Sequence, residues 1–286
     1  MIHPTRPRMF ALLALVAAAC TGGPGTMVHL GKTLNPSRSY TVDAYTETRS
    51  AIEITRMPGL EQVDVGERHA STSRSRQVLT SGPRDGGAFS LRLETLSYEG
   101  TEDSVSQSFD LSGVYGLASF DTTTRMISLT SLEGECRDSL LTREDVGSYL
   151  VNAYQAIQGS LLDSLRMYTI GRSDTISGLQ LHPMGPLNMT LMEYSVFTLD
   201  RVEGDSAWFR VERWAELVPD STVTAANTVV EGRGSGTMVF HIPEKYVVDT
   251  RLTTDLKVTH TTDSLSFVAT SGSRVEVTTV IAPVTP

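Results

Sequence analysis

The sequence is poor in cysteine, in basic charge and in long hydrophobic runs. Only Cys20 and Cys136 occur among the 286 residues, so the fold has no disulfide framework and depends on packing. Lys and Arg number 24 against 33 Asp and Glu, which disfavours nucleic acid or an anionic lipid surface as the main partner. The apolar run at residues 10–19 is about half as long as the roughly 20 residues that a helix needs to cross a bilayer.

Recognisable catalytic and metal-binding motifs are also missing. The six histidines have no second histidine or cysteine at ligand spacing, which predicts neither a metal site nor a cofactor. The glycine-rich residues 232–236 lack the lysine and spacing of a phosphate-binding loop, and the chain has no Gly-x-Ser-x-Gly serine motif. His241 and His260 lie on predicted strands and could meet in space, and Cys136 has no predictable histidine partner. We therefore predict that the chain is not an enzyme.

The N-terminus carries an export signal. Arg6 and Arg8 precede the apolar run, and the small residues Ala17, Ala18 and Ala19 end it. A basic segment, a short apolar segment and a small-residue cleavage site together predict a secretory signal at residues 1–19.

Cys20 follows this signal directly, and the whole pattern resembles the signal of bacterial lipoproteins. The resemblance covers residues 1–20 and departs from the usual pattern at Ala17, where those signals have leucine; ordinary cleavage after Ala19 is the alternative. It implies that Cys20 is lipidated and holds the protein on a membrane. Thr21 stands where an aspartate tends to retain such proteins at the inner membrane, so the resemblance implies the periplasmic face of the outer membrane.

Composition divides the rest of the chain in two. Residues 20–36 begin with small, flexible residues and predict a lipidated N-terminus with a linker. Residues 37–286 are long enough for one large domain with a sizeable core. In this part, residues 40–44, 89–93, 209–211 and 238–242 alternate between apolar and polar, as do several other runs, and turn residues separate them. The alternation predicts antiparallel sheet with one wet face.

One segment has a different period. Thr142 and Asp145 have the form of a helix N-cap, and apolar residues then recur from Val146 to Leu161 at helical spacing. We predict a helix at about 143–165 that packs its apolar side on the sheet. The regions on either side, residues 37–135 and 166–286, both contain a glycine-marked strand followed by another strand, which suggests an internal duplication. The predicted fold is α+β and mostly β, with one curved sheet or two.

Trp208 and Trp214 are six residues apart in one predicted strand, so they share a face if the strand is regular, while Phe209 and Val211 take the other. The tryptophans either pack in the core or line a pocket for an apolar ligand.

The layout resembles a set of uncharacterised bacterial lipoproteins with two β-rich halves joined by a helix and a proline-containing stretch at residues 181–186. It implies a non-enzymatic envelope protein. Our first hypothesis is therefore a lipid-anchored binding or scaffold module, with a membrane and an apolar or envelope ligand as partners. An alternative is a carrier of lipid or acyl chains between sheet and helix, similar to lipoprotein-carrier and insertion factors. A hydrolase is the third possibility and would need a clustered polar site.

Overall fold

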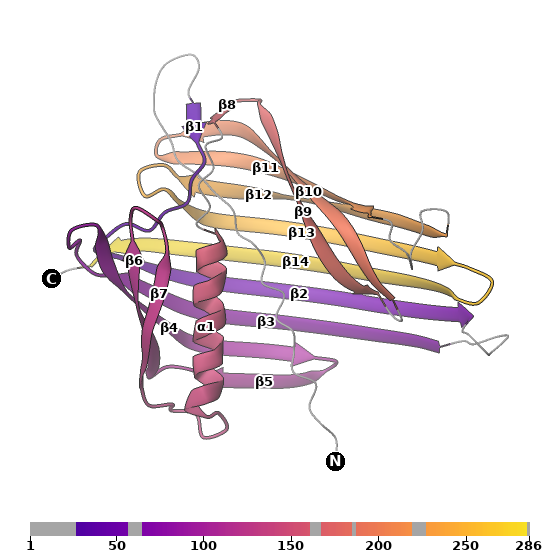
Figure 1. Ribbon diagram of the computed structural model, residues 1–286, viewed down its shortest axis with the longest axis horizontal. Helices are drawn as coiled ribbons and strands as arrows, with labels where there is room; N and C mark the ends of the chain where they lie inside the picture. The colour runs from indigo at the N-terminus through magenta and orange to yellow at the C-terminus, as the bar shows by residue number, and fades with distance from the viewer. Residues whose placement is uncertain (1–26, 57–64, 161–166, 185–186, 219–226, 285–286) are drawn as a thin grey trace.

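The computed structural model describes residues 27–56, 65–160, 167–184, 187–218 and 227–284 (Figure 1). Within them, one large antiparallel sheet holds twelve strands. They are β2 (Arg38–Arg56), β3 (Val65–Ser81), β4 (Ala88–Glu102), β5 (Val105–Asp110), β6 (Val114–Asp121), β7 (Ile127–Gly134), β9 (Ser173–Met184), β10 (Leu187–Glu203), β11 (Ser206–Leu217), β12 (Thr228–His241), β13 (Tyr246–Thr261) and β14 (Ser266–Pro283). A separate ribbon pairs β1 (Met27–His29) with β8 (Met167–Thr169), and the helix α1 (Arg143–Ser160) follows β7.

The strand order confirms the mostly β, antiparallel fold and shows one continuous sheet. It runs β7-β6-β4-β3-β2-β14-β13-β12-β11-β10-β9, with β5 on the far part of β4. Strands that lie side by side are close in the chain except at the centre of the sheet. There β2 pairs with β14 along their whole length, from Arg38 opposite Pro283 to Arg56 opposite Ser266.

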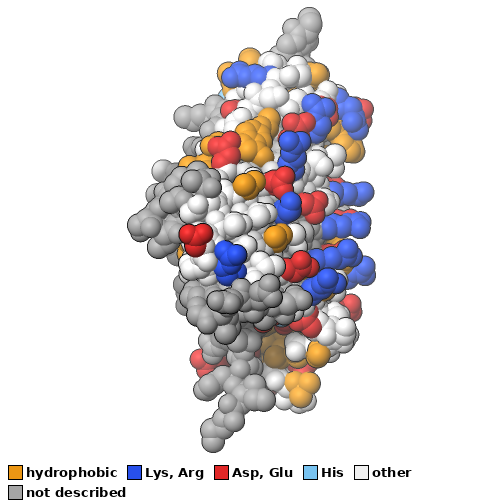
Figure 2. All heavy atoms as spheres, turned by 90° about the vertical axis from the view of Figure 1, so that its right-hand side faces the viewer, with side chains coloured by type: hydrophobic (Ala, Val, Ile, Leu, Met, Phe, Trp, Pro, Cys, Tyr) orange, Lys and Arg blue, Asp and Glu red, His pale blue; other side chains and the backbone are white. Residues whose placement is uncertain are grey.

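The two faces of the sheet differ in chemistry. We call the face that α1 covers the inner face, and the opposite one the outer face. Three clusters of buried apolar side chains lie on the inner face, each under a different element (Figure 1). The first lies under α1, the second under the β1–β8 ribbon and the third under the far end of the β9–β10 hairpin. The outer face carries rows of acidic and basic side chains, visible along one side of the molecule in Figure 2.

The helix begins where the sequence predicts. Thr142 Oγ1 accepts a hydrogen bond from the Asp145 amide at 3.1 Å, and Asp145 Oδ2 accepts one from the Thr142 amide at 2.9 Å, a reciprocal capping arrangement. Val146, Leu150 and Tyr154 are buried against β4 and β6. The predicted residues 161–165 lie outside the described part of the chain. No helix among the described residues has the length and apolarity for a membrane crossing.

A glycine in β6 brings the helix close to the sheet. The Tyr154 hydroxyl donates to the Gly116 carbonyl oxygen at 2.8 Å, and a Cβ at position 116 would lie 2.6 Å from the Tyr154 ring. Gly147 does the same from the helix side, since a Cβ there would lie 2.7 Å from Leu132 Cδ1. These contacts fill the space between helix and sheet, and they do not support the alternative that acyl chains bind there.

The predicted linker at residues 20–36 is too long at its C-terminal end. Val28, Leu30 and Leu34 are buried, so from Met27 the chain belongs to the folded body. Lys32 is buried with them, its Nζ 4.4 Å from the centre of the Tyr246 ring. Burial lowers the pKa of Lys32 to about 7. The glycines and prolines of this segment favour a linker and hide a short apolar alternation.

The two hairpins behind the predicted duplication have different places in the sheet. In the first, Phe120 of β6 lies opposite Ile127 of β7, at one edge. In the second, Phe240 of β12 lies opposite Val247 of β13, inside the sheet. The duplication stays a prediction.

Candidate functional site

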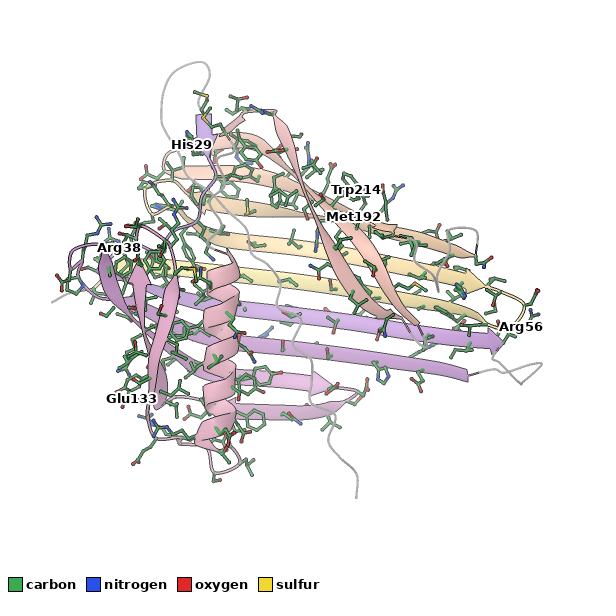
Figure 3. The ribbon with its side chains drawn as sticks, viewed as in Figure 1. His29, Arg38, Arg56, Glu133, Met192 and Trp214 are labelled. Atoms are coloured by element: carbon green, nitrogen blue, oxygen red, sulfur yellow. The ribbon has the colours of Figure 1, made fainter. Side chains whose placement is uncertain are left out.

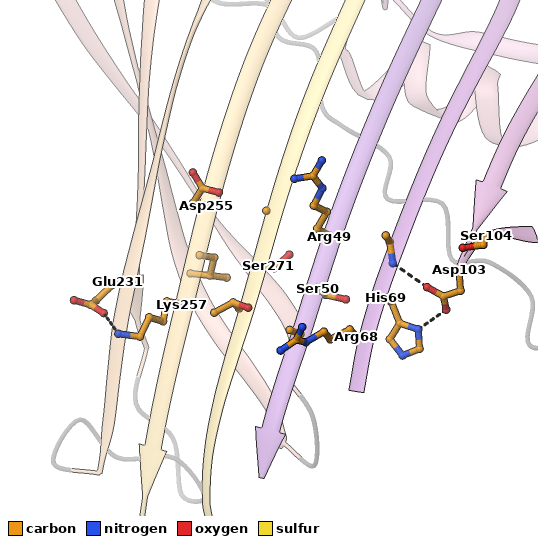
Figure 4. Close-up of a pocket in the computed structure, with 15 residues that line it drawn as sticks. Arg49, Ser50, Arg68, His69, Asp103, Ser104, Glu231, Asp255, Lys257 and Ser271 are labelled. Atoms are coloured by element: carbon orange, nitrogen blue, oxygen red, sulfur yellow. Dashed lines mark hydrogen bonds and ion pairs between the residues drawn. The ribbon is translucent and has the colours of Figure 1, made fainter. Parts of the chain in front are cut away.

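A groove on the outer face is the candidate functional site (Figure 4). It has a volume of about 780 Å³ and crosses β12, β13, β14, β2 and β3. This volume is within the range of about 300–1,000 Å³ that is usual for ligand sites.

Strand register explains why the surface is hollowed here. One row across the strands places Ala70 beside Arg49, Arg49 beside Gly272 and Gly272 beside Asp255. The next row places Arg68, Ala51, Thr270, Lys257 and Glu231 side by side. Small side chains in the middle of each row leave a depression between charged ones. At Gly272 there is no room for a larger residue without a shift, since a Cβ there would lie 3.0 Å from Asp255 Oδ1.

The rim carries charge of both signs. Lys257 Nζ lies 2.8 Å from Glu231 Oε2, and this contact lowers the pKa of Glu231. Arg68 lies 3.9 Å from Glu53, and Arg49 lies 2.5 Å from Glu47. The basic member of each pair is at least half exposed. Exposed pairs of this kind contribute roughly 0–1 kcal/mol, so a charged ligand can replace either partner at small cost.

A histidine–aspartate pair lies at one end of the groove, where it joins the β4–β5 turn to β3. His69 Nδ1 lies 2.7 Å from Asp103 Oδ2, and the Ala70 amide donates to Asp103 Oδ1 at 2.9 Å. The hydrogen bond to Asp103 raises the pKa of His69, and the same bond lowers the pKa of Asp103. Asp103 and Ser104 have φ angles of 45° and 74° in the turn between β4 and β5, so the pair fixes that turn against β3.

A second polar group lies on the inner face, across β9, β10 and β11. Glu193 accepts from His182 Nε2 at 2.9 Å and from Arg213 at 2.7 Å. The hydrogen bond from His182 is the main cause that lowers the pKa of Glu193. All three side chains are mostly buried and use one another as partners. The group ties the three strands together.

The two tryptophans share the outer face, as the alternation predicts, and Phe209 and Val211 are buried on the inner face. Neither tryptophan belongs to the three core clusters or lines the groove. Arg201 stacks on Trp208 at 4.2 Å from the ring centre, and Tyr194 stacks on Trp214 at 5.0 Å. Trp214 and Met192 lie on neighbouring strands at this surface (Figure 3).

The other predicted residues are scattered. His260 is buried and pairs with Thr228 at 2.9 Å, whereas His241 lies at the other end of β12, so the two imidazoles do not meet. Cys136 is half-buried with its Sγ 3.5 Å from the Asp138 carbonyl oxygen. No group of three or more metal-ligating side chains occurs in the part of the chain that the structure describes. Cys20 lies outside the described residues.

Sequence reasoning missed the groove. Its residues come from six separate segments, of which five are ordinary strand segments and one is the turn at Asp103 and Ser104. The signal that was present is a single small residue on the outer face of each of three strands, Ala51 in β2, Ala70 in β3 and Gly272 in β14. Only strand order and register bring these positions together.

The sequence matches no family model and no curated protein. Among solved structures, one similar chain is an outer membrane channel from Pseudomonas putida F1, with a TM-score of 0.26 and 9% identity over 91% of this chain and 100% of that chain. Another is a DUF1329 family protein from Desulfovibrio piger ATCC 29098, with a TM-score of 0.13 and 9% identity over 84% of this chain and 85% of that chain. At these scores neither likeness bears on the function of this chain.

Proposed function

We propose that this protein is a lipid-anchored, non-enzymatic binding protein of the bacterial envelope that takes its ligand in the outer-face groove. The N-terminal signal ending at Cys20 supports the anchor, and the position of Thr21 supports the periplasmic face of the outer membrane. The proposed binding role rests on the groove, because strand register determines the shape of the groove.

The rim defines the class of ligand. Arg49, Arg68 and Lys257 supply positive charge, and Glu231, Asp255 and Asp103 supply negative charge. The ligand that complements such a rim carries both signs and is extended enough to lie across several strands. A polypeptide segment has both properties, and neighbouring strands about 4.8 Å apart give it a span of roughly 19 Å over five strands.

Site-specific cross-linking in cells tests the binding role. A photo-reactive amino acid at Ala51, on the groove floor, is expected to trap a partner protein. The same residue at Met126, which is 52% exposed outside the groove, is the matched control. Gly272→Gln should fill the groove and abolish the cross-link from position 51. Gly178→Gln, at a glycine with no atom within 4 Å of its would-be Cβ, should leave the cross-link intact.

Equal cross-linking from positions 51 and 126, or a cross-link that survives Gly272→Gln, would contradict the binding role. The anchor is tested separately by growing cells with labelled palmitate. Cys20→Ser should abolish the label and release the protein from the membrane fraction. An unchanged label would rule out the anchor.

A further inference from the structure

The β1–β8 ribbon has one buried side and one exposed side. Val28 and Tyr168 lie opposite each other in the ribbon and are fully buried. Tyr168 meets Phe209 edge-on at 5.3 Å between ring centres. The ribbon is therefore held by the apolar cluster beneath it, and its outward positions are fixed in space.

The outward positions hold the apolar Met27 and Met167 beside His29 and Thr169, and the apolar Ile170 follows the ribbon. Met27 is 45% exposed, Met167 is 39% exposed and Ile170, directly after β8, is 57% exposed. Single exposed apolar side chains are common on proteins. Here, however, three of them come from two segments that are about 140 residues apart in the chain. Two lie on a ribbon of only three pairs, and the third comes directly after it. The exposed Arg172 follows them.

The sequence places this ribbon next to the proposed anchor. Six residues, 21–26, separate Cys20 from Met27. A fully extended chain covers at most about 3.6 Å per residue, so the ribbon cannot be more than roughly 25 Å from the lipidated cysteine. A flexible glycine-rich linker of this length has an average span of about 15 Å. The ribbon thus stays at a high effective concentration near the bilayer surface.

We infer that the β1–β8 ribbon contacts the bilayer, with Met27, Met167 and Ile170 entering the headgroup layer beside the lipidated Cys20. This inference rests on the proposed lipid anchor. The acidic net charge of the chain opposes the approach of the whole body to an anionic surface. The contact therefore depends on the tether and on apolar side chains, with Arg172 as the adjacent cation.

The consequence concerns the groove. Val247, at the start of β13, belongs to the apolar cluster under the ribbon, and Lys257 lines the groove further along the same strand. Ten residues of strand from Val247 to Lys257 span about 33 Å. A membrane contact at the ribbon therefore leaves the groove free for a partner.

Fluorescence quenching in vesicles tests the contact with the full lipidated protein. The probe is an environment-sensitive NBD dye on Ile170→Cys in a Cys136→Ser background, and Met167→Cys serves as a second labelled variant. Val105→Cys is the matched control, because Val105 is 62% exposed and lies on β5, across the sheet from the ribbon (Figure 1). The vesicles contain phosphatidylethanolamine, phosphatidylglycerol and a lipid with a nitroxide near its headgroup.

We expect quenching at positions 170 and 167 to be several-fold stronger than at 105. Equal quenching at all three positions, in protein that still floats with the vesicles, would overturn the ribbon contact and leave the anchor standing. Cross-linking of position 170 to a second copy, with quenching no stronger than at 105, would also overturn it. Protein that is not acylated at Cys20 and does not float would refute the anchor and the contact together.

Discussion

Gly116 sets the distance between α1 and the sheet, and replacing it with alanine tests that packing. The added Cβ would lie 2.6 Å from Tyr154 Cε2 and 3.4 Å from Leu129 Cδ1. Ordinary carbon contacts are about 3.5–4.0 Å, so the ring would have to move by about 1 Å. The ring is buried, and its hydroxyl is bonded to the carbonyl of Gly116 itself. Movement of the ring would therefore strain this hydrogen bond.

The cost follows from these contacts. Overpacking of a filled core costs about 1–3 kcal/mol. Alanine also restricts the unfolded chain, which stabilises the folded protein by about 0.4–1 kcal/mol. We expect Gly116→Ala to lower the free energy of unfolding by about 1–2 kcal/mol. The change should be smaller when Tyr154→Leu has already removed the ring, because residues in contact are energetically coupled.

Urea denaturation followed by circular dichroism measures these differences, and hydrogen exchange of the α1 amides shows whether the loss is local to the helix. Gly178→Ala is the matched control, because no atom lies within 4 Å of its would-be Cβ. If Gly116→Ala were as stable as the parent protein, or if Tyr154→Leu left its cost unchanged, the close approach of helix and sheet would be refuted.

Three further predictions concern titration and capping. Burial holds the pKa of Lys32 at about 7 against an ordinary 10.5, so the unfolded chain binds more protons between these values and stability rises with pH across that window. Lys32→Met should remove a penalty of roughly 4–5 kcal/mol at pH 7 and below and flatten the curve, and parallel denaturation curves from pH 6 to 10 would contradict this. In an NMR titration, the His69 ring should titrate above its ordinary pKa, and the Asp103→Asn variant should return it to that pKa. The ionic hydrogen bond between the two side chains is present at pH values above the lowered pKa of Asp103 and below the raised pKa of His69. An unchanged titration in the variant would exclude this bond. Thr142→Ala should cost about 1 kcal/mol by removing the N-cap, whereas Ser148→Ala, one turn into the helix, should cost less in the same denaturation assay.

Much of the fold could be predicted because its signals are local. Alternation at residues 89–93 and 209–211 marks strands in which every second side chain is buried, and β4 and β11 show that pattern. The helix start could be predicted because the cap of Thr142 and Asp145 is contained in four residues. The shared face of Trp208 and Trp214 follows from strand geometry alone.

The rest depends on contacts between distant segments. Nothing in β2 itself indicates that its neighbour is β14 rather than another strand, and the groove exists only because that pairing places Gly272 beside Arg49. Which of the two faces of β11 is covered could not be predicted from the sequence for a similar reason. When a strand has large side chains on both faces, its own sequence does not show which face is buried. In β11 the buried face is the one that carries Phe209, because the β1–β8 ribbon and its apolar cluster pack on it.

The pairing of β2 with β14 also governs the order of assembly. Each side of the sheet is a meander that can grow by adding the next strand along the chain, but the seam at the centre joins segments more than 200 residues apart. Loop-closure entropy makes such a contact slow to form. The long free edges of both meanders therefore stay unpaired until the last strand is present, and a nascent molecule needs protection from unwanted strand pairing during that interval.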